Sequence, residues 1–181
     1  MDAEILHLYT SPGHSYFGHF GQPPGGQPML EVNEVACVAG HGIVGDRYFD
    51  HLLDFKGQIT FFDHSVHLDL LPLFLVKDVS PSVYRRNVIL RGVDLNTLVG
   101  REFELQGLRF QGVEECRPCV WMEQAVGGGA ENAMRGRGGL RARILTSGTL
   151  RCSRSSIANA PVQLLFSETK ARPRERSYPT S

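Results

Sequence analysis

Residues Arg101–Val113, with the sequence REFELQGLRFQGV, decide the fold class of this 181-residue chain. The two runs REFEL and LRFQGV alternate apolar and polar residues, as a strand with one buried face does. They meet across Gln106–Gly107, and a two-residue connection containing glycine is the usual signal for a tight β-hairpin. The stretch therefore predicts two antiparallel strands joined by a short turn.

The same alternation with a period of two recurs along the rest of the chain. It predicts six further strands, at Ile5–Tyr9, Leu30–Val38, Gln58–Phe62, Asn87–Leu90, Leu140–Leu145 and Val162–Phe166. Only His64–Leu75 is typical of a substantial helix, and we expect it to bend or end near Pro72. Eight short strands and one helix predict a mainly β protein, a β-barrel with a few peripheral helices.

Length and composition predict one domain. With 41% hydrophobic residues, a chain of this size buries enough surface to need neither a disulfide nor a structural metal. We expect residues 1–169 to form this domain, with Ser11–Pro28 as a long ordered loop, and residues 170–181 to be a disordered tail. No apolar run approaches the roughly 20 residues of a membrane span, and the N-terminus does not resemble a signal peptide. We therefore expect a cytoplasmic protein with reduced thiols and no membrane contact.

Charge is distributed unevenly, although the net charge is zero. Residues 1–84 carry three basic and ten acidic side chains, a net charge of −7, whereas residues 85–181 carry sixteen basic and nine acidic side chains, a net charge of +7. Fifteen of those sixteen are arginines. Because guanidinium groups bind phosphate or carboxylate bidentately, this half predicts a small anionic ligand. Nucleic acid is the alternative, but no basic helix, zinc finger or aromatic RNA-binding motif supports it.

Residues Glu115–Glu123, ECRPCVWME, carry the clearest chemistry. Pro118 fits the first position of a short helix, which would place Cys119 in the first helical turn. Helical N–H groups and the Arg117 guanidinium would then favour a thiolate. Cys119 is therefore a candidate sulfur ligand or nucleophile, and the alternative is an inert buried cysteine.

Cys116 and Cys119 also have the spacing of a zinc half-site or of a thiol redox pair. A structural zinc site usually needs a second pair, whereas Cys37 and Cys152 are isolated in the sequence. A thioredoxin-like pair follows a strand in a βαβ unit, which the strand-rich pattern does not offer. Both interpretations therefore rest on spacing alone.

Three other segments are candidates for an anion site. Gly40–Arg47 (GHGIVGDR) is a glycine-spaced segment that forms either a turn or a phosphate cradle. Arg85–Asn87 precedes a β-branched strand, where it lies either at a functional barrel rim or in a solvated turn. Arg135–Arg143 ends in an alternating stretch in which Arg141 and Arg143 share one face of a strand.

Four motifs in order carry a resemblance to a known family. They are GIVGDRYF (42–49), GQITFFD (57–63), YRRNVILRGVDLNTLVGREFELQGLRFQGVEECRPCVWME (84–123) and GRGGLRARILTSGTLR (136–151). Together they closely resemble the MOSC domain, named from the C-terminal part of molybdenum cofactor sulfurases and also found as small free-standing bacterial proteins. The resemblance extends roughly from Ile5 to Phe166 and implies a MOSC-type β-barrel, similar to the pyruvate kinase β-barrel.

This resemblance also implies a ligand, the molybdenum cofactor, which is a pyranopterin phosphate carrying molybdenum on a dithiolene. The family's essential cysteine falls on Cys119, as a molybdenum ligand or a carrier of persulfide sulfur. Its R-x-N element falls on Arg86 and Asn87, and its G-D-R element ends on Arg47. With the charge distribution and the motif positions, Arg117 and Arg141 complete the predicted cofactor-binding set.

The chain departs from the family in two respects. Tyr48 stands where many members have histidine, and the pyridoxal-phosphate desulfurase domain of the full sulfurases has no room here. The sequence leaves open a sulfur carrier or sulfur transferase, a molybdenum-dependent oxidoreductase and a non-catalytic cofactor carrier, with a zinc-binding or thiol-redox protein as a further alternative. A sulfur carrier or transferase would need a cysteine desulfurase as its partner, and an oxidoreductase would need an electron-transfer protein.

Overall fold

A computed structural model describes residues 2–15, 25–73, 79–152 and 154–159. Its strands are β1 (Asp2–Thr10), β2 (Leu30–Val32), β3 (Glu34–Val38), β4 (Gly42–Ile43), β5 (Ile59–Asp63), β6 (Val88–Arg91), β7 (Glu102–Leu105), β8 (Leu108–Glu115), β9 (Leu140–Ile144), β10 (Gly148–Arg151) and β11 (Arg154–Asn159). The helices are α1 (His64–Leu70), α2 (Trp121–Ala125) and α3 (Ala130–Ala133), and short 3₁₀ turns lie at Leu71–Leu73, Pro81–Tyr84 and Leu95–Leu98. The predicted mainly β class with a few short helices is confirmed.

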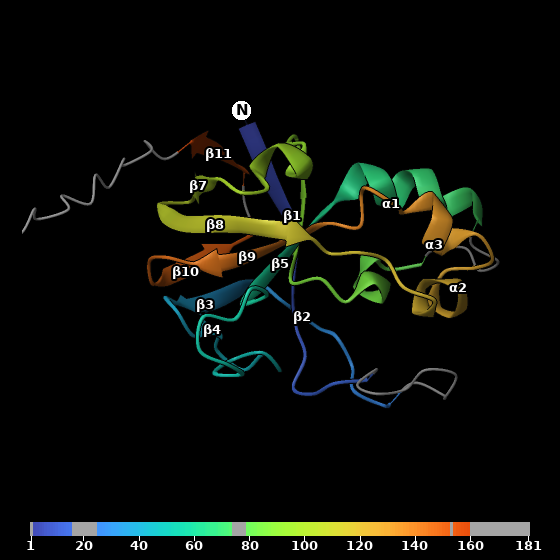
Figure 1. Ribbon diagram of the computed structural model, residues 1–181, viewed down its shortest axis with the longest axis horizontal. Coiled ribbons are helices and arrows are strands. Elements are labelled where there is room, and N and C mark those ends of the chain that lie inside the picture. The colour runs from blue at the N-terminus through green and yellow to red at the C-terminus, as the bar shows by residue number, and fades with distance from the viewer. Residues whose placement is uncertain (1, 16–24, 74–78, 153, 160–181) are drawn as a thin grey trace, which may run out of the picture.

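The larger sheet has the strand order β11-β7-β8-β9-β5-β6-β1-β2, and β11 also pairs with β1. These pairings connect the strands from β1 through β6, β5, β9, β8 and β7 to β11 in a ring, with β5 and β6 as its parallel pair. A smaller sheet has the order β10-β3-β4. Figure 1 shows the strands on one side of the molecule and the three α-helices gathered on the other.

The predicted hairpin is confirmed by the pairing of β7 with β8, in which Leu105 lies opposite Leu108. Gln106 and Gly107 both have positive φ, 54° and 78°, as the favoured two-residue hairpin turn requires. The buried Phe103 and Phe110 of this hairpin stack with ring centroids 5.4 Å apart, and both meet Phe61 of β5 edge-on. These contacts hold the hairpin against β5 in the core that the ring of strands encloses.

A second hydrophobic cluster joins the strands to the helices. Tyr84 stacks on Phe62 with centroids 4.2 Å apart, and Met122 and Val126 belong to the same buried cluster. The helix predicted at His64–Leu75 begins after Asp63, whose side chain accepts a hydrogen bond from the Ser65 N–H. It ends as an α-helix at Leu70 and tightens to 3₁₀ geometry around Pro72, so the expected break is confirmed.

Other boundaries differ from the sequence-based prediction. Leu30–Val38 is not one strand but two, β2 and β3, because the chain bends at Asn33 and passes from one sheet to the other. Strands β10 (GTLR) and β11 (RSSIAN) were not predicted, since neither segment shows a clear alternation of apolar and polar residues. The predicted strand at Val162–Phe166 and the tail 170–181 lie outside the described residues. Within the described part of the chain, no helix is both long and apolar enough to span a bilayer.

Candidate functional site

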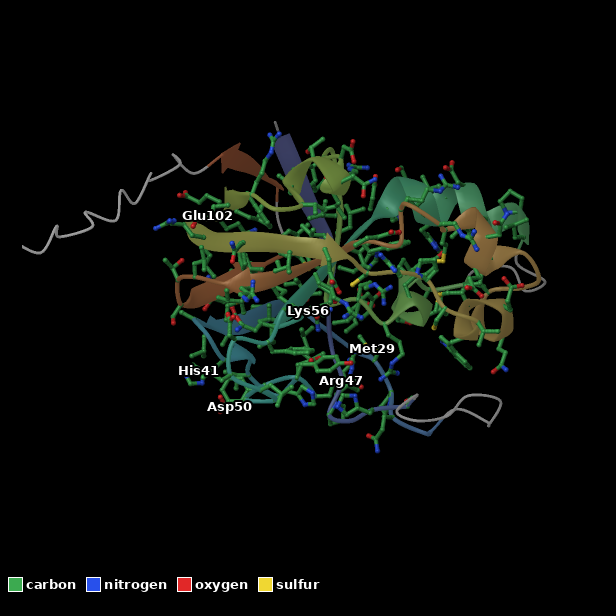
Figure 2. All side chains as sticks on the ribbon, in the orientation of Figure 1. Met29, His41, Arg47, Asp50, Lys56 and Glu102 are labelled. Carbon is green, nitrogen blue, oxygen red and sulfur yellow. The ribbon has the colours of Figure 1, made fainter. Side chains whose placement is uncertain are left out.

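A pocket of about 270 Å³ lies between the strands and the helices. Arg47, labelled in Figure 2, is one of the lining residues. The pocket is lined by His14, Ser15, Arg47, Tyr48, Tyr84, Arg85, Arg86, Arg117, Pro118, Cys119, Trp121, Met122 and Arg141. The fold thus joins segments that are widely separated in sequence around one thiol and five guanidinium groups.

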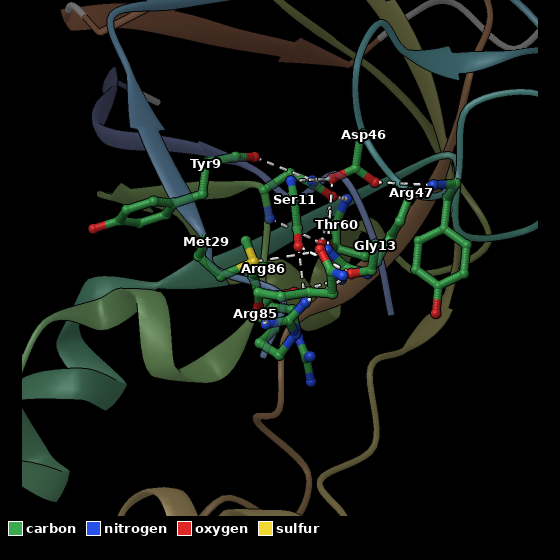
Figure 3. A network of polar contacts seen from close by, with 12 residues as sticks. Tyr9, Ser11, Gly13, Met29, Asp46, Arg47, Thr60, Arg85 and Arg86 are labelled. Carbon is green, nitrogen blue, oxygen red and sulfur yellow. Dashed lines mark hydrogen bonds and ion pairs between the residues drawn. The ribbon is translucent and has the colours of Figure 1, made fainter. Parts of the chain in front are cut away.

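Five predicted site residues line this pocket, namely Arg47, Arg86, Arg117, Cys119 and Arg141. The sixth, Asn87, is only 2% exposed and lies behind the pocket wall. Its side-chain oxygen accepts hydrogen bonds from the N–H and hydroxyl of Thr60, and its amide donates to the Tyr9 carbonyl and to Asp46. Asn87 therefore has the contacts of a residue that supports the pocket, and Figure 3 shows its partners Tyr9, Asp46 and Thr60 in this network.

Replacing Asn87 with alanine should destabilise the protein by about 3 kcal/mol. The change would leave the buried Asp46 carboxylate and the Thr60 hydroxyl with fewer hydrogen bonds, and a lost partner of a buried polar group typically costs about 1–3 kcal/mol, more for a charged one. Urea unfolding followed by circular dichroism measures this change. Asn96→Ala is the control because the Asn96 side chain donates to Gly136 at an exposed site, and a loss as small as that of this control would contradict the structural role.

The G-D-R element at the end of Gly40–Arg47 also faces inward. Asp46 accepts hydrogen bonds from the Ser11 N–H and from Asn87, and the Arg47 side chain, 7% exposed, lies beside this carboxylate at 3.5 Å. The N–H groups of Asp46 and Arg47 donate to main-chain carbonyls. Because those N–H groups already have partners, this segment is better described as a turn that positions Arg47 than as a phosphate cradle.

Arg85 and Arg86 point in different directions from the end of the 3₁₀ turn Pro81–Tyr84. Arg85, with φ of 53°, donates to the Gln27 and Gly13 carbonyls and to the Ser11 hydroxyl, which joins the two described ends of the Ser11–Pro28 loop. Arg86 donates from Nε to Gly138, from Nη1 to Tyr84 and from Nη2 to Cys116, each time to a carbonyl oxygen. Arg86 thus connects three segments that border the pocket.

The predicted position of Cys119 inside a helical turn is wrong. Helix α2 begins at Trp121 with Val120 at its cap, so Pro118 and Cys119 lie before the helix, and the Cys119 carbonyl accepts a hydrogen bond from the Met122 N–H. The Cys116 N–H donates to the Gly139 carbonyl and the Cys116 carbonyl accepts from Arg86. These long-range contacts hold the segment in an irregular conformation that local helix signals cannot predict.

The two cysteines of the C-x-x-C motif have different environments. Cys119 is exposed and lines the pocket, whereas Cys116 is only 2% exposed and belongs to the interior. Neither cysteine is in a disulfide. Among the described residues, no group of three or more His, Cys, Asp or Glu side chains is arranged to hold a metal ion. The accessible sulfur of the pocket is therefore that of Cys119.

Arg117 and Arg141 lie around a carboxylate at the end of β8. Glu114 contacts Lys56 at 2.8 Å and Arg141 at 3.3 Å. The hydrogen bond from Lys56 lowers the pKa of Glu114, burial opposes this effect, and the charges of Lys56, Arg141 and Arg117 lower the pKa further, so that the net shift is downward. Glu114 is thus ionised at neutral pH, and three cations surround one anion.

An aromatic wall that the sequence analysis did not assign completes the pocket. Tyr48 stacks on Phe55 with centroids 5.0 Å apart and meets His14 edge-on at 4.9 Å, while Trp121 lines the pocket from α2. Burial lowers the pKa of His14, and the nearby Arg47 charge adds to that effect. Tyr48 follows the G-D-R element directly, which is a usable signal, whereas His14 belongs to a loop without periodicity.

Comparisons with known proteins give the fold and the family. Structures similar to this chain include YuaD from Bacillus subtilis, with 16% identity over 87% of this chain and 94% of that chain and a TM-score of 0.67. YiiM from Geobacillus stearothermophilus is also similar, with 11% identity over 87% of this chain and 75% of that chain and a TM-score of 0.62. YiiM from Escherichia coli has 14% identity over 88% of this chain and 71% of that chain, with a TM-score of 0.61. A search of curated protein sequences found no match. The sequence model of the MOSC domain matches residues 62–155, just over half of the chain, and the protein therefore belongs to the MOSC domain family.

Proposed function

We propose that this protein binds molybdenum cofactor in the arginine-lined pocket, with Cys119 as a sulfur ligand of the metal. The observation that carries the proposal is the convergence of one exposed thiol and five arginines on a single pocket. Membership of the MOSC family supports it, because this family is associated with molybdenum cofactor and sulfur binding.

The chemistry of the lining residues fits each part of such a ligand. A thiolate is a soft ligand of the kind that suits a thiophilic metal, and guanidinium groups pair with phosphate through charge-assisted hydrogen bonds. The rings of Tyr48 and Trp121 offer apolar surface to a planar heterocycle. A volume of about 270 Å³ is slightly below the roughly 300–1,000 Å³ of small-molecule sites, so part of the ligand would remain accessible.

When bound, the molybdenum would supply a redox centre and a site for sulfur transfer, and the chain would bind and orient it. Cys119 would contact the metal from the segment that Arg86 holds through the Cys116 carbonyl. The aromatic wall would exclude water from one face of the ligand. Sulfur carriage and reductive chemistry both require such an accessible metal ligand, and each would involve a cytoplasmic partner, a cysteine desulfurase or an electron-transfer protein.

The sole tryptophan of the chain, Trp121, lines the pocket and supplies a direct assay. Cofactor released from a molybdoenzyme under anaerobic conditions should quench Trp121 fluorescence in cofactor-free protein and should elute with the protein in gel filtration. Arg101→Gln, which changes an exposed side chain outside the pocket lining, should behave as the wild type. Unchanged fluorescence together with separate elution of the pterin would refute the proposal.

A further inference from the structure

We infer that Arg117 and Arg141 hold the anionic group of the ligand, and that Arg47, Arg85 and Arg86 build the pocket instead of binding that group. The inference rests on the proposed function for the identity of the ligand and deepens it by separating two roles among five arginines in the same pocket. It differs from the sequence-based prediction that Arg86 itself binds the cofactor.

The donors of Arg47, Arg85 and Arg86 are largely engaged within the protein. Arg86 directs all three of its guanidinium nitrogens to main-chain carbonyls, and Arg85 donates to two carbonyls and one hydroxyl. Arg47 pairs with Asp46 and donates to the Arg85 carbonyl. A ligand that recruited these groups would have to break hydrogen bonds that shape the pocket, so their net gain from anion binding would be small.

Arg117 and Arg141 have donors available. Arg117 is exposed, and its side chain has no hydrogen bond or ion pair with any other described residue. Arg141 is 37% exposed, and its contact within the described chain is a single nitrogen 3.3 Å from Glu114. Both line the pocket that also contains Cys119. An arriving anion would therefore gain charge-assisted hydrogen bonds without breaking any that hold the fold.

The local charge favours an anion at this place. Lys56 and Arg141 contact Glu114, and the Arg117 charge also acts on that carboxylate. Three cations around one carboxylate leave a surplus of two positive charges in this cluster, and two of its cations, Arg117 and Arg141, line the pocket that contains Cys119. This surplus matches a phosphate monoester, which carries close to two negative charges at neutral pH.

Phosphate binding by cofactor-free protein tests this assignment, with inorganic phosphate as the probe and calorimetry as the measurement. Arg117→Gln and Arg141→Gln should each raise the phosphate Kd roughly tenfold, since each removes a charge-assisted contact, and should leave the melting temperature without phosphate unchanged. Glu114→Gln should lower the Kd several-fold, because it removes a repelling charge and keeps an acceptor for Arg141. Arg86→Lys should instead lower the melting temperature, and Arg101→Gln should match the wild type.

Absence of saturable phosphate binding by the wild type, or a Kd for Arg117→Gln and Arg141→Gln equal to that of Arg101→Gln, would overturn the inference. A loss of phosphate binding in Arg86→Lys at an unchanged melting temperature would overturn it as well. The pterin content after expression in a cofactor-producing host distinguishes a failure of this inference from a failure of the proposed function. Arginine-dependent phosphate binding without pterin in the wild type would refute only the proposed function, whereas full pterin content in both glutamine variants would refute only the inference.

Discussion

Replacing Cys119 with serine should remove molybdenum from the protein, whereas Cys116→Ser should leave most of it. The Cys119 thiol is exposed and lines the pocket, but Cys116 is buried and does not line it. A serine hydroxyl stays protonated near neutral pH and is a poor ligand for a soft metal. The loss in Cys119→Ser should therefore be chemical, with the fold retained.

Molybdenum content by mass spectrometry, normalised to protein, measures this difference. Melting curves of both variants establish that each is folded, because a hydroxyl at the buried Cys116 position can itself cost about 1–3 kcal/mol. The rate of thiol alkylation reports how accessible the Cys119 sulfur is. This rate should be measured in a Cys152→Ser background, because the Cys152 thiol is also exposed and would react as well. Equal loss of metal from both folded variants would indicate a paired-thiol site, as in a zinc or redox centre, and would contradict the assignment of Cys119 alone.

Replacing Gly138 with alanine should displace the segment that carries Cys119. An added Cβ would overlap the Cys116 carbonyl oxygen and would lie 2.9 Å from Cδ of Pro118. The Gly138 N–H donates to Glu115 and its carbonyl accepts from Arg86, so the chain cannot move aside without losing these contacts. We expect a destabilisation of about 3 kcal/mol, as for severe overpacking, and a pterin content reduced at least tenfold.

Gly128→Ala is the matched control, because an added Cβ at Gly128 would meet no atom within 4 Å. This variant should keep its pterin, and its free energy of unfolding should change by less than about 1 kcal/mol. Urea unfolding and pterin fluorescence measure the two quantities on both variants. Wild-type pterin content in a folded Gly138→Ala protein would show that the packing of Gly138 against Cys116 and Pro118 does not position the site.

Much of the fold follows from local pattern. The alternation in Leu140–Ile144 places Leu140, Ala142 and Ile144 in the core and Arg141 and Arg143 on the opposite face, and the structure confirms this. The hairpin at Gln106–Gly107 and the end of α1 before Pro72 are confirmed in the same way. In each case the signal lies within a short continuous stretch of residues, so a single sequence is sufficient.

The details of the site depend on contacts that no local pattern contains. The segment around Cys119 is fixed by Arg86, which lies 30 residues before the Cys116 whose carbonyl it binds. Asn87 appears in sequence as part of a charged trio, yet it is buried in a network with Thr60 and Asp46. Motif position therefore predicted five of the residues that line the pocket, but not which of their donors are already engaged within the protein.

Metal and pterin analysis of the wild-type protein, purified from a host that makes molybdenum cofactor, shows whether the pocket holds this cofactor, as we propose. We expect molybdenum and pterin in similar molar amounts, both retained through dialysis, because the pocket offers one accessible thiol surrounded by guanidinium groups. Stoichiometric zinc that survives dialysis, with molybdenum and pterin absent even after cofactor overproduction, would contradict it.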